Sequence, residues 1–210
     1  MSGRKPVAVV AALAAVVLPS CTRVVSDARA VAGERPSAAA LSDDNECTPV
    51  DAPLAVIPTD AGDPVMKIPQ PPGWVRFTKM DSEILRYMLQ NEDLTASAVV
   101  TGESIDGAAD PEALFDGVQE GIIEMTGAPP TEVARHRHCG LPAESASFVN
   151  PGFGPTGPMP TKALTVVMER DGRTHGVTVQ VASNAPDDPT YASYAETILT
   201  GFQMLPPPPS

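Results

Sequence analysis

The 210-residue sequence lacks two features that define large classes of protein, an excess of basic residues and a long hydrophobic run. Its 14 Lys and Arg stand against 26 Asp and Glu, which gives a formal net charge of -12. We expect no nucleic-acid partner, because phosphate binding needs a basic surface that releases counterions. The same charge disfavours electrostatic docking on anionic lipid. No segment approaches the roughly 20 apolar residues of a transmembrane helix, so any membrane association needs another cause.

Motifs of catalysis and cofactor binding are also missing. The sequence contains no Walker loop, His-Glu-x-x-His helix or Cys-x-x-Cys pair. Gly152 to Gly157 match the GxGxxG pattern, but prolines interrupt the segment and a strand pattern follows, so we interpret it as a loop. Ser104 lies in Gly102 to Asp106, which lacks the second glycine of a nucleophile elbow. We therefore expect no enzymatic activity and no cofactor.

The N-terminus has the pattern of an export signal. Arg4 and Lys5 precede an uncharged apolar run from Val7 to Leu18, which is too short to span a bilayer and suits a signal peptide. Leu18-Pro19-Ser20-Cys21 then resembles the lipobox of bacterial lipoproteins, in which the cysteine thiol takes a diacylglyceryl group. Pro19 departs from the small or aliphatic residue usual at that position.

Two outcomes of export follow from these residues. If Cys21 is acylated, the protein is anchored by lipid at the outer face of the cell membrane, because two or more acyl chains give stable anchoring. Ala28-Arg29-Ala30 and Ala30-Val31-Ala32 offer the small-x-small pattern of a conventional signal peptidase, and cleavage there predicts a soluble secreted protein. We take lipid anchoring as the expectation and soluble secretion as the alternative.

Export permits a disulfide bond. With Cys21 assigned to lipid, Cys47 and Cys139 can pair only with each other. The bond would tie the start of the folded domain to its middle and stabilise it by about 2–4 kcal/mol. The alternative is two buried free thiols.

The chain divides into four parts by composition. Residues 1–20 are predicted to be the signal peptide and residues 21–46 a flexible tether without aromatic residues. Residues 47–205 form one domain, and residues 206–210 are a proline-rich tail that continues neither helix nor strand. Of the 24 prolines, only Pro36 lies in the tether.

Two amphipathic helices are predicted within the domain. Each begins with an Asp-Pro pair, Asp110-Pro111 and Asp188-Pro189, in which Asp caps the helix and Pro occupies its first position. Apolar residues recur at helical spacing in both segments, and Gly127 ends the first. The apolar residues are Leu114, Val118, Ile122 and Met125 in the first helix and Tyr191, Tyr194, Ala195, Ile198, Leu199 and Phe202 in the second.

Three β-hairpins are predicted from alternating patterns. They pair residues 84–90 with 96–103, residues 133–139 with 143–149 across Gly140-Leu141-Pro142, and residues 162–169 with 174–182 across Asp171-Gly172. Hairpins with two segregated helices indicate an α+β domain, a mostly antiparallel sheet with helices packed on its faces.

Two groups of side chains are candidates for a site. His136 and His138 lie two apart on a strand and could ligate zinc with His175, as in a metal-dependent hydrolase, but we favour a solvated strand face and predict no metal site. Trp74, Met88 and Met168 are the candidates for an apolar ligand pocket, since methionines line adaptable pockets and Trp74 is the only tryptophan. For Trp74 we favour a buried role in the core, and a ligand contact is the alternative.

Three stretches resemble a known family: KIPQPPGW (Lys67–Trp74), CGLPAESASFV (Cys139–Val149) and GVTVQVASNAPDDPTYASYAETILTGFQM (Gly176–Met204). In this order, behind a lipobox, they look like the LpqN/LpqT-type lipoproteins of mycobacteria and their actinobacterial relatives. The resemblance implies a Mog1/PsbP-like fold, a place in the cell envelope and no enzymatic activity. It also implies a role in handling envelope lipids or contacting envelope proteins.

The resulting hypothesis is an exported, lipid-anchored binding protein that takes an apolar envelope lipid or an envelope protein partner. The alternative is a structural or protein-interaction lipoprotein without a ligand pocket. The hydrolase with His136 or His138 is the third candidate.

Overall fold

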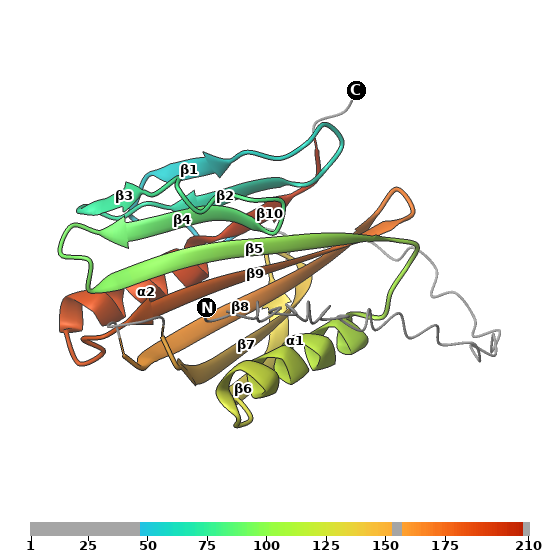
Figure 1. Ribbon diagram of the computed structural model, residues 1–210. Helices are drawn as coiled ribbons and strands as arrows, with labels where there is room; N and C mark the ends of the chain where they lie inside the picture. The colour runs from blue at the N-terminus through green and yellow to red at the C-terminus, as the bar shows by residue number, and fades with distance from the viewer. Residues whose placement is uncertain (1–46, 153–156, 208–210) are drawn as a thin grey trace, which may run out of the picture. The chain divides into compact units, whose positions relative to one another are not determined.

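The computed structural model describes residues 47–152 and 157–207. This part of the chain contains ten strands and two helices (Figure 1). The strands are β1 (Leu54–Ile57), β2 (Val65–Pro69), β3 (Trp74–Arg76), β4 (Leu85–Asn91), β5 (Ala96–Asp106), β6 (Thr131–His138), β7 (Leu141–Asn150), β8 (Met159–Arg170), β9 (Arg173–Ser183) and β10 (Gln203–Leu205). The helices are α1 (Pro111–Thr126) and α2 (Pro189–Gly201).

The strands form two antiparallel sheets. The larger has the order β3-β4-β5-β9-β8-β7-β6, and the smaller has the order β1-β2-β10. Helix α2 and the small sheet cover one face of the large sheet, where side chains such as Leu89, Val179 and Ile198 share one hydrophobic core. Helix α1 packs on β7 and β8 at the opposite face, through Ile122, Phe148 and Ala163. The predicted α+β fold with helices on both faces of an antiparallel sheet is confirmed.

Both predicted helices are present with their caps. The Asp110 side chain accepts a hydrogen bond from the Glu112 N–H at 3.1 Å, and Asp188 accepts one from the Thr190 N–H at 2.8 Å. Helix α1 ends at Gly127, whose φ of 74° lies in the left-handed region that glycine adopts without strain. The Asp-Pro signal therefore located both helix starts correctly.

All three predicted hairpins are present; the turn agrees with the prediction at Asp171-Gly172 and differs from it between β6 and β7. Asp171 and Gly172 join β8 to β9 with φ values of 51° and 75°, as a type I′ turn requires. The turn between β6 and β7 is Cys139-Gly140, with φ values of 49° and 76°, rather than the predicted Gly140-Leu141-Pro142. Pro142 lies inside β7 opposite Arg137. Alternate pairs of an antiparallel ladder exchange no hydrogen bonds, and such a position accommodates a residue without an N–H.

The predicted disulfide between Cys47 and Cys139 is present, with a sequence separation of 92 residues. It holds the first described residue against the β6–β7 turn. Beside it, the His138 Nε2 atom lies 2.6 Å from the Phe202 carbonyl oxygen at the end of α2. The disulfide and the His138 contact together join the start of the domain, the β6–β7 turn and the end of α2.

Several predictions concern residues outside the described ranges. These are the signal peptide, the acylation of Cys21 and the tether (residues 1–46), most of the Gly152–Gly157 loop, and the end of the proline-rich tail (208–210). No helix of the described residues is long and apolar enough to cross a membrane.

Candidate functional site

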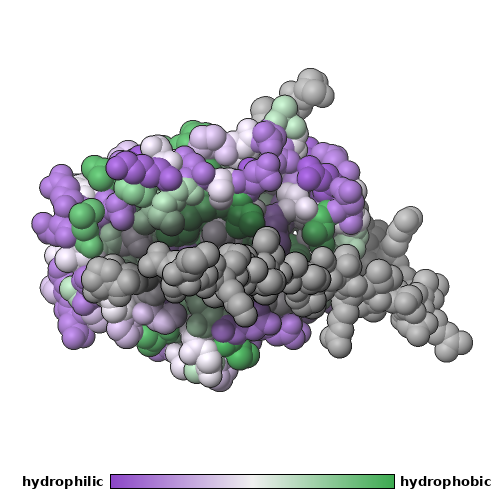
Figure 2. Space-filling model, in the orientation of Figure 1, coloured by the Kyte–Doolittle hydropathy of each residue, from purple (hydrophilic) through white to green (hydrophobic). Residues whose placement is uncertain are grey.

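A groove lies between α1 and the part of the large sheet that α1 leaves uncovered. Helix α1 packs on β7 and β8, and the groove opens on its other side, over β5 and β9. Its volume is about 310 Å³. Figure 2 shows hydrophobic surface on this face, over the β4–β5 side of the sheet. The lining residues are Ile84, Thr101, Gly102, Glu103, Leu114, Val118, Gly121, Ile122, Met125, Thr165, Gly176, Thr178 and Gln180.

The helical wall of the groove is the predicted apolar stripe of α1. Leu114, Val118, Ile122 and Met125 recur about one turn apart; Ile122 is buried against the sheet, and the other three remain partly exposed. Met125 is 40% exposed, and Ile84 on the opposite rim is 67% exposed. Only part of the stripe is used in packing, and the remainder is free to contact an apolar molecule.

The floor of the groove consists mainly of small, uncharged side chains. Alternation along the strands directs Thr101 and Thr178 into the groove, while Val100 and Val179 point into the core on the other face. The Oγ1 atoms of Thr165 and Thr178 lie 3.0 Å apart and are hydrogen-bonded. Glu103 is the only charged residue among those that line the groove. The lining therefore suits an uncharged, apolar ligand.

Glycines widen the groove on both sides. Gly121 lies in the middle of α1, and a Cβ atom there would meet nothing within 4 Å. A Cβ atom at Gly176 in β9 would also meet nothing within 4 Å. A glycine inside a helix costs about 1 kcal/mol relative to alanine. Gly121 therefore leaves this part of the helical wall without a side chain.

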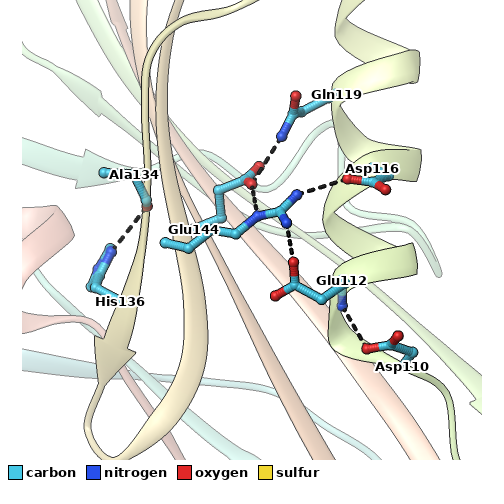
Figure 3. Close-up of polar contacts among 8 residues, drawn as sticks. Asp110, Glu112, Asp116, Gln119, Ala134, His136 and Glu144 are labelled. Carbon is cyan, nitrogen blue, oxygen red and sulfur yellow. Dashed lines mark hydrogen bonds and ion pairs between the residues drawn. The ribbon is translucent and has the colours of Figure 1, made fainter.

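A charged network holds α1 on the sheet (Figure 3). Glu144 of β7 is buried, and its Oε2 atom accepts from Arg135 Nε and Gln119 Nε2, both at 2.9 Å. The Arg135 guanidinium also donates to Glu112 and Asp116 of α1. Hydrogen bonds to Glu144 and Asp116 raise the pKa of Arg135. A buried carboxylate is stable only when it is paired, so these contacts fix the wall of the groove.

The predicted pocket residues do not lie together. Trp74 and Met168 belong to the core beneath α2, and Trp74 makes an edge contact with Tyr194 at 6.4 Å between ring centroids. Met88 lies between Tyr87 and Leu89 in β4 and so points to the opposite face of the sheet. Met88 and Met168 are not among the residues that line the groove. The structure thus separates Met88 from the other two residues, because strand alternation places them on different faces.

The three histidines are also apart. His136 is exposed, with Nδ1 3.2 Å from the Ala134 carbonyl oxygen, and His138 bonds Phe202 as described above. His175 in β9 is separated from β6 by two strands, which corresponds to about 14 Å. Residues 47–152 and 157–207 contain no group of three side chains suited to a metal ion. Burial lowers the pKa values of His138 and His175.

His175 does contact a hydroxyl group. Its Nδ1 atom lies 2.7 Å from Ser104 Oγ. The adjacent cavity has a volume of about 20 Å³, which is room for about one water molecule. A substrate does not fit there, so we interpret the pair as a structural contact between β5 and β9.

A larger apolar cavity of about 610 Å³ lies at the ends of β7 and β8. Prolines, threonines and Phe148 line it, and Pro151 and Pro158 in its wall flank residues 153–156, which the structure does not describe. The groove beside α1 is lined by residues of α1 and of the large sheet, away from residues 153–156, and is our candidate site. Sequence reasoning identified its helical wall but not its floor, whose Thr and Gly residues carry no apolar signal.

Comparison with solved structures supports the fold. The crystal structure of LpqN, involved in cell envelope biogenesis of Mycobacterium tuberculosis, is similar over 74% of this chain and 94% of LpqN, with a TM-score of 0.59 and 14% sequence identity. Two further structures also match. Cyanobacterial PsbP from Synechocystis sp. PCC 6803 has a TM-score of 0.47 and 13% sequence identity, over 76% of this chain and 97% of PsbP. The Ran-binding protein Mog1p of Saccharomyces cerevisiae has a TM-score of 0.43 and 9% sequence identity, over 74% of this chain and 97% of Mog1p. No protein-family model and no curated protein matches the chain. At 14% sequence identity, the likeness to LpqN shows a shared fold and no more.

Proposed function

We propose that the protein is an exported, lipid-anchored and non-enzymatic binding protein of the cell envelope, whose groove beside α1 takes the apolar part of an envelope lipid. One observation carries the proposal: a groove of about 310 Å³ with an apolar helical wall and a floor on which Glu103 is the one charged residue among those that line it. A methylene group is similar in size to a water molecule, of about 30 Å³, so the groove has room for roughly ten. Burying them contributes about 0.8 kcal/mol each.

The cell-envelope setting has two supports. The lipobox at Leu18–Cys21 predicts acylation after export. LpqN, which shares the fold, is described as involved in cell envelope biogenesis. Metabolic labelling with a palmitate analogue tests the anchor: we expect label on the wild-type chain and none on a Cys21→Ser variant. Equal labelling of both would place any lipid elsewhere.

The binding experiment uses the purified full-length chain and the neutral fluorescent probe N-phenyl-1-naphthylamine. We expect the probe to become fluorescent on binding and to be displaced by long-chain alcohols, since the groove contributes almost no charge to recognition. Native mass spectrometry of the same preparation should detect a co-purified lipid. Absence of both signals would favour the alternative, a protein-interaction lipoprotein without a ligand.

A further inference from the structure

A row of three threonines crosses the floor of the groove beside α1. Thr178 of β9 lies opposite Thr101 of β5 on one side and opposite Thr165 of β8 on the other. All three line the groove, and they share the α1 face of the sheet because alternate residues such as Val179 lie in the core on the other face. Hydroxyl groups therefore face the apolar wall of α1 across the groove.

Burial determines the direction of the hydrogen bond within this threonine row. Thr165 is 4% exposed, and among residues 47–152 and 157–207 the only hydrogen-bond partner of its Oγ1 atom is the Thr178 Oγ1 atom, at 3.0 Å. A buried hydroxyl donor that stays unpaired is costly, so nearly all such groups are paired. Thr165 therefore donates its proton, and Thr178 accepts it.

The Thr178 hydroxyl keeps its own proton available for a ligand. Thr178 is partly exposed in the groove, and its Oγ1 atom has no other hydrogen-bond partner in the described part of the chain. Thr101 differs, since its Oγ1 atom donates to the Thr178 carbonyl oxygen at 3.5 Å. Water accepts the Thr178 proton when no ligand is bound. A ligand that displaces this water has to supply an acceptor, because the donor is otherwise left unpaired.

The charge of the groove selects against a carboxylate as this acceptor. None of the lining residues is Lys, Arg or His, and Glu103 is the one charged residue among them. Glu103 lies opposite Gly176, two residues from Thr178 along β9, and so shares the face of the threonine row. Removing a fatty-acid anion from water without a cation to pair with it is unfavourable. A neutral carbonyl group accepts the same hydrogen bond without this cost.

We infer that the groove selects acyl esters, with the ester carbonyl oxygen accepting from the Thr178 hydroxyl and the acyl chain lying along the apolar wall of α1. This inference rests on the proposed lipid-binding function and adds the chemical class of the ligand. Thr178 recognises the ester, and Glu103 disfavours the free fatty acid. Thr165 positions the Thr178 hydroxyl through their shared hydrogen bond.

The experiment compares methyl nonanoate with undecane, a hydrocarbon of equal chain length, on the full-length protein. Binding is measured as depletion of each vapour from the headspace above the solution, which suits poorly soluble ligands. Thr178→Val keeps the shape of the side chain and removes the hydroxyl. We expect this variant to bind the ester about tenfold more weakly, because the ester carbonyl loses its donor, and to bind undecane at least as tightly as the wild type.

Thr101→Val is the matched control, because it removes a hydroxyl from the same row whose proton is already used within the chain. We expect it to bind both ligands like the wild type. Thr178→Val also leaves the Thr165 hydroxyl unpaired, so the double variant Thr165→Val with Thr178→Val, which removes both partners, should show the same loss of ester affinity without loss of stability. Equal weakening of the ester by Thr101→Val and Thr178→Val, or wild-type ester affinity in the double variant, would refute the assigned contact.

The free acid tests the role of charge. At neutral pH, nonanoate should displace the naphthylamine probe less well than methyl nonanoate, and Glu103→Gln should narrow this difference by about two- to fivefold. The control Glu120→Gln removes a charge from α1 outside the groove lining and should leave the difference unchanged. A preference for the acid over the ester would overturn the inference and leave the lipid groove in place. If the ester, undecane and the probe all fail to bind, the lipid groove itself is refuted, and this inference with it.

Discussion

Two glycines of α1 provide a matched test of the groove. Gly117 and Gly121 are one turn apart, both are exposed, and a Cβ atom at either would meet nothing within 4 Å. Only Gly121 lines the groove. Replacing either glycine with leucine should stabilise the helix by almost 1 kcal/mol, because leucine is close to alanine in helix propensity. In a chain of this size we expect the melting temperature to rise by about 2–4 °C in both variants.

Ligand binding should distinguish the two variants. The leucine side chain at position 121 enters the groove, and overfilling an apolar site costs about 1–3 kcal/mol, which corresponds to an affinity about 5- to 150-fold lower. Gly117→Leu should bind the naphthylamine probe like the wild type. Scanning calorimetry and fluorescence titration measure the two quantities. If Gly121→Leu were stabilised and still bound the probe with wild-type affinity, the ligand would not lie in this groove.

Three further predictions concern the stability of the domain. A Cβ atom at Gly201 would lie 2.4 Å from Val50 Cγ2, so Gly201→Ala should lower the free energy of unfolding by about 1–3 kcal/mol, measured in urea. Cys139→Ser removes the disulfide and should cost about 2–4 kcal/mol; an unchanged denaturation midpoint would contradict this. Burial lowers the pKa of His138 below its usual 6.5, so the unfolded chain takes up this proton at higher pH than the folded chain. The contribution of neutral His138 to the free energy of unfolding is therefore complete above about pH 6.5 and declines below it. Between pH 7 and pH 5, the His138→Gln variant should lose less stability than the wild type.

The elements with strong local signals were predictable from the sequence. Asp-Pro pairs determine both helix starts, and the long alternating patterns of β8 and β9 predict a hairpin around Asp171-Gly172. Strands β1, β2, β3 and β10 were not predicted. They contain three to five residues each, which is too short for a clear alternating pattern. β1 and β2 lie among the prolines between Pro49 and Pro72, and β2 packs against α2.

The site was less predictable than the fold, for a physical reason. Methionine and tryptophan drew attention to Trp74, Met88 and Met168, yet burial in the core satisfies such side chains as well as a ligand does. The groove is defined instead by where α1 stops covering the sheet. That boundary depends on the pairing of Arg135 with Glu144 across β6 and β7, which no local pattern in the sequence reveals.

Photo-cross-linking with a diazirine-bearing fatty alcohol, followed by peptide mapping of the full-length protein, tests the lipid groove most directly. We predict adducts on α1 between Leu114 and Met125 and on the facing strands at residues 101–103 and 176–180, and a loss of these adducts in Gly121→Leu but not in Gly117→Leu. Adducts confined to residues 147–151 and 158–162 would move the lipid to the cavity at the ends of β7 and β8 and contradict the groove as the binding site.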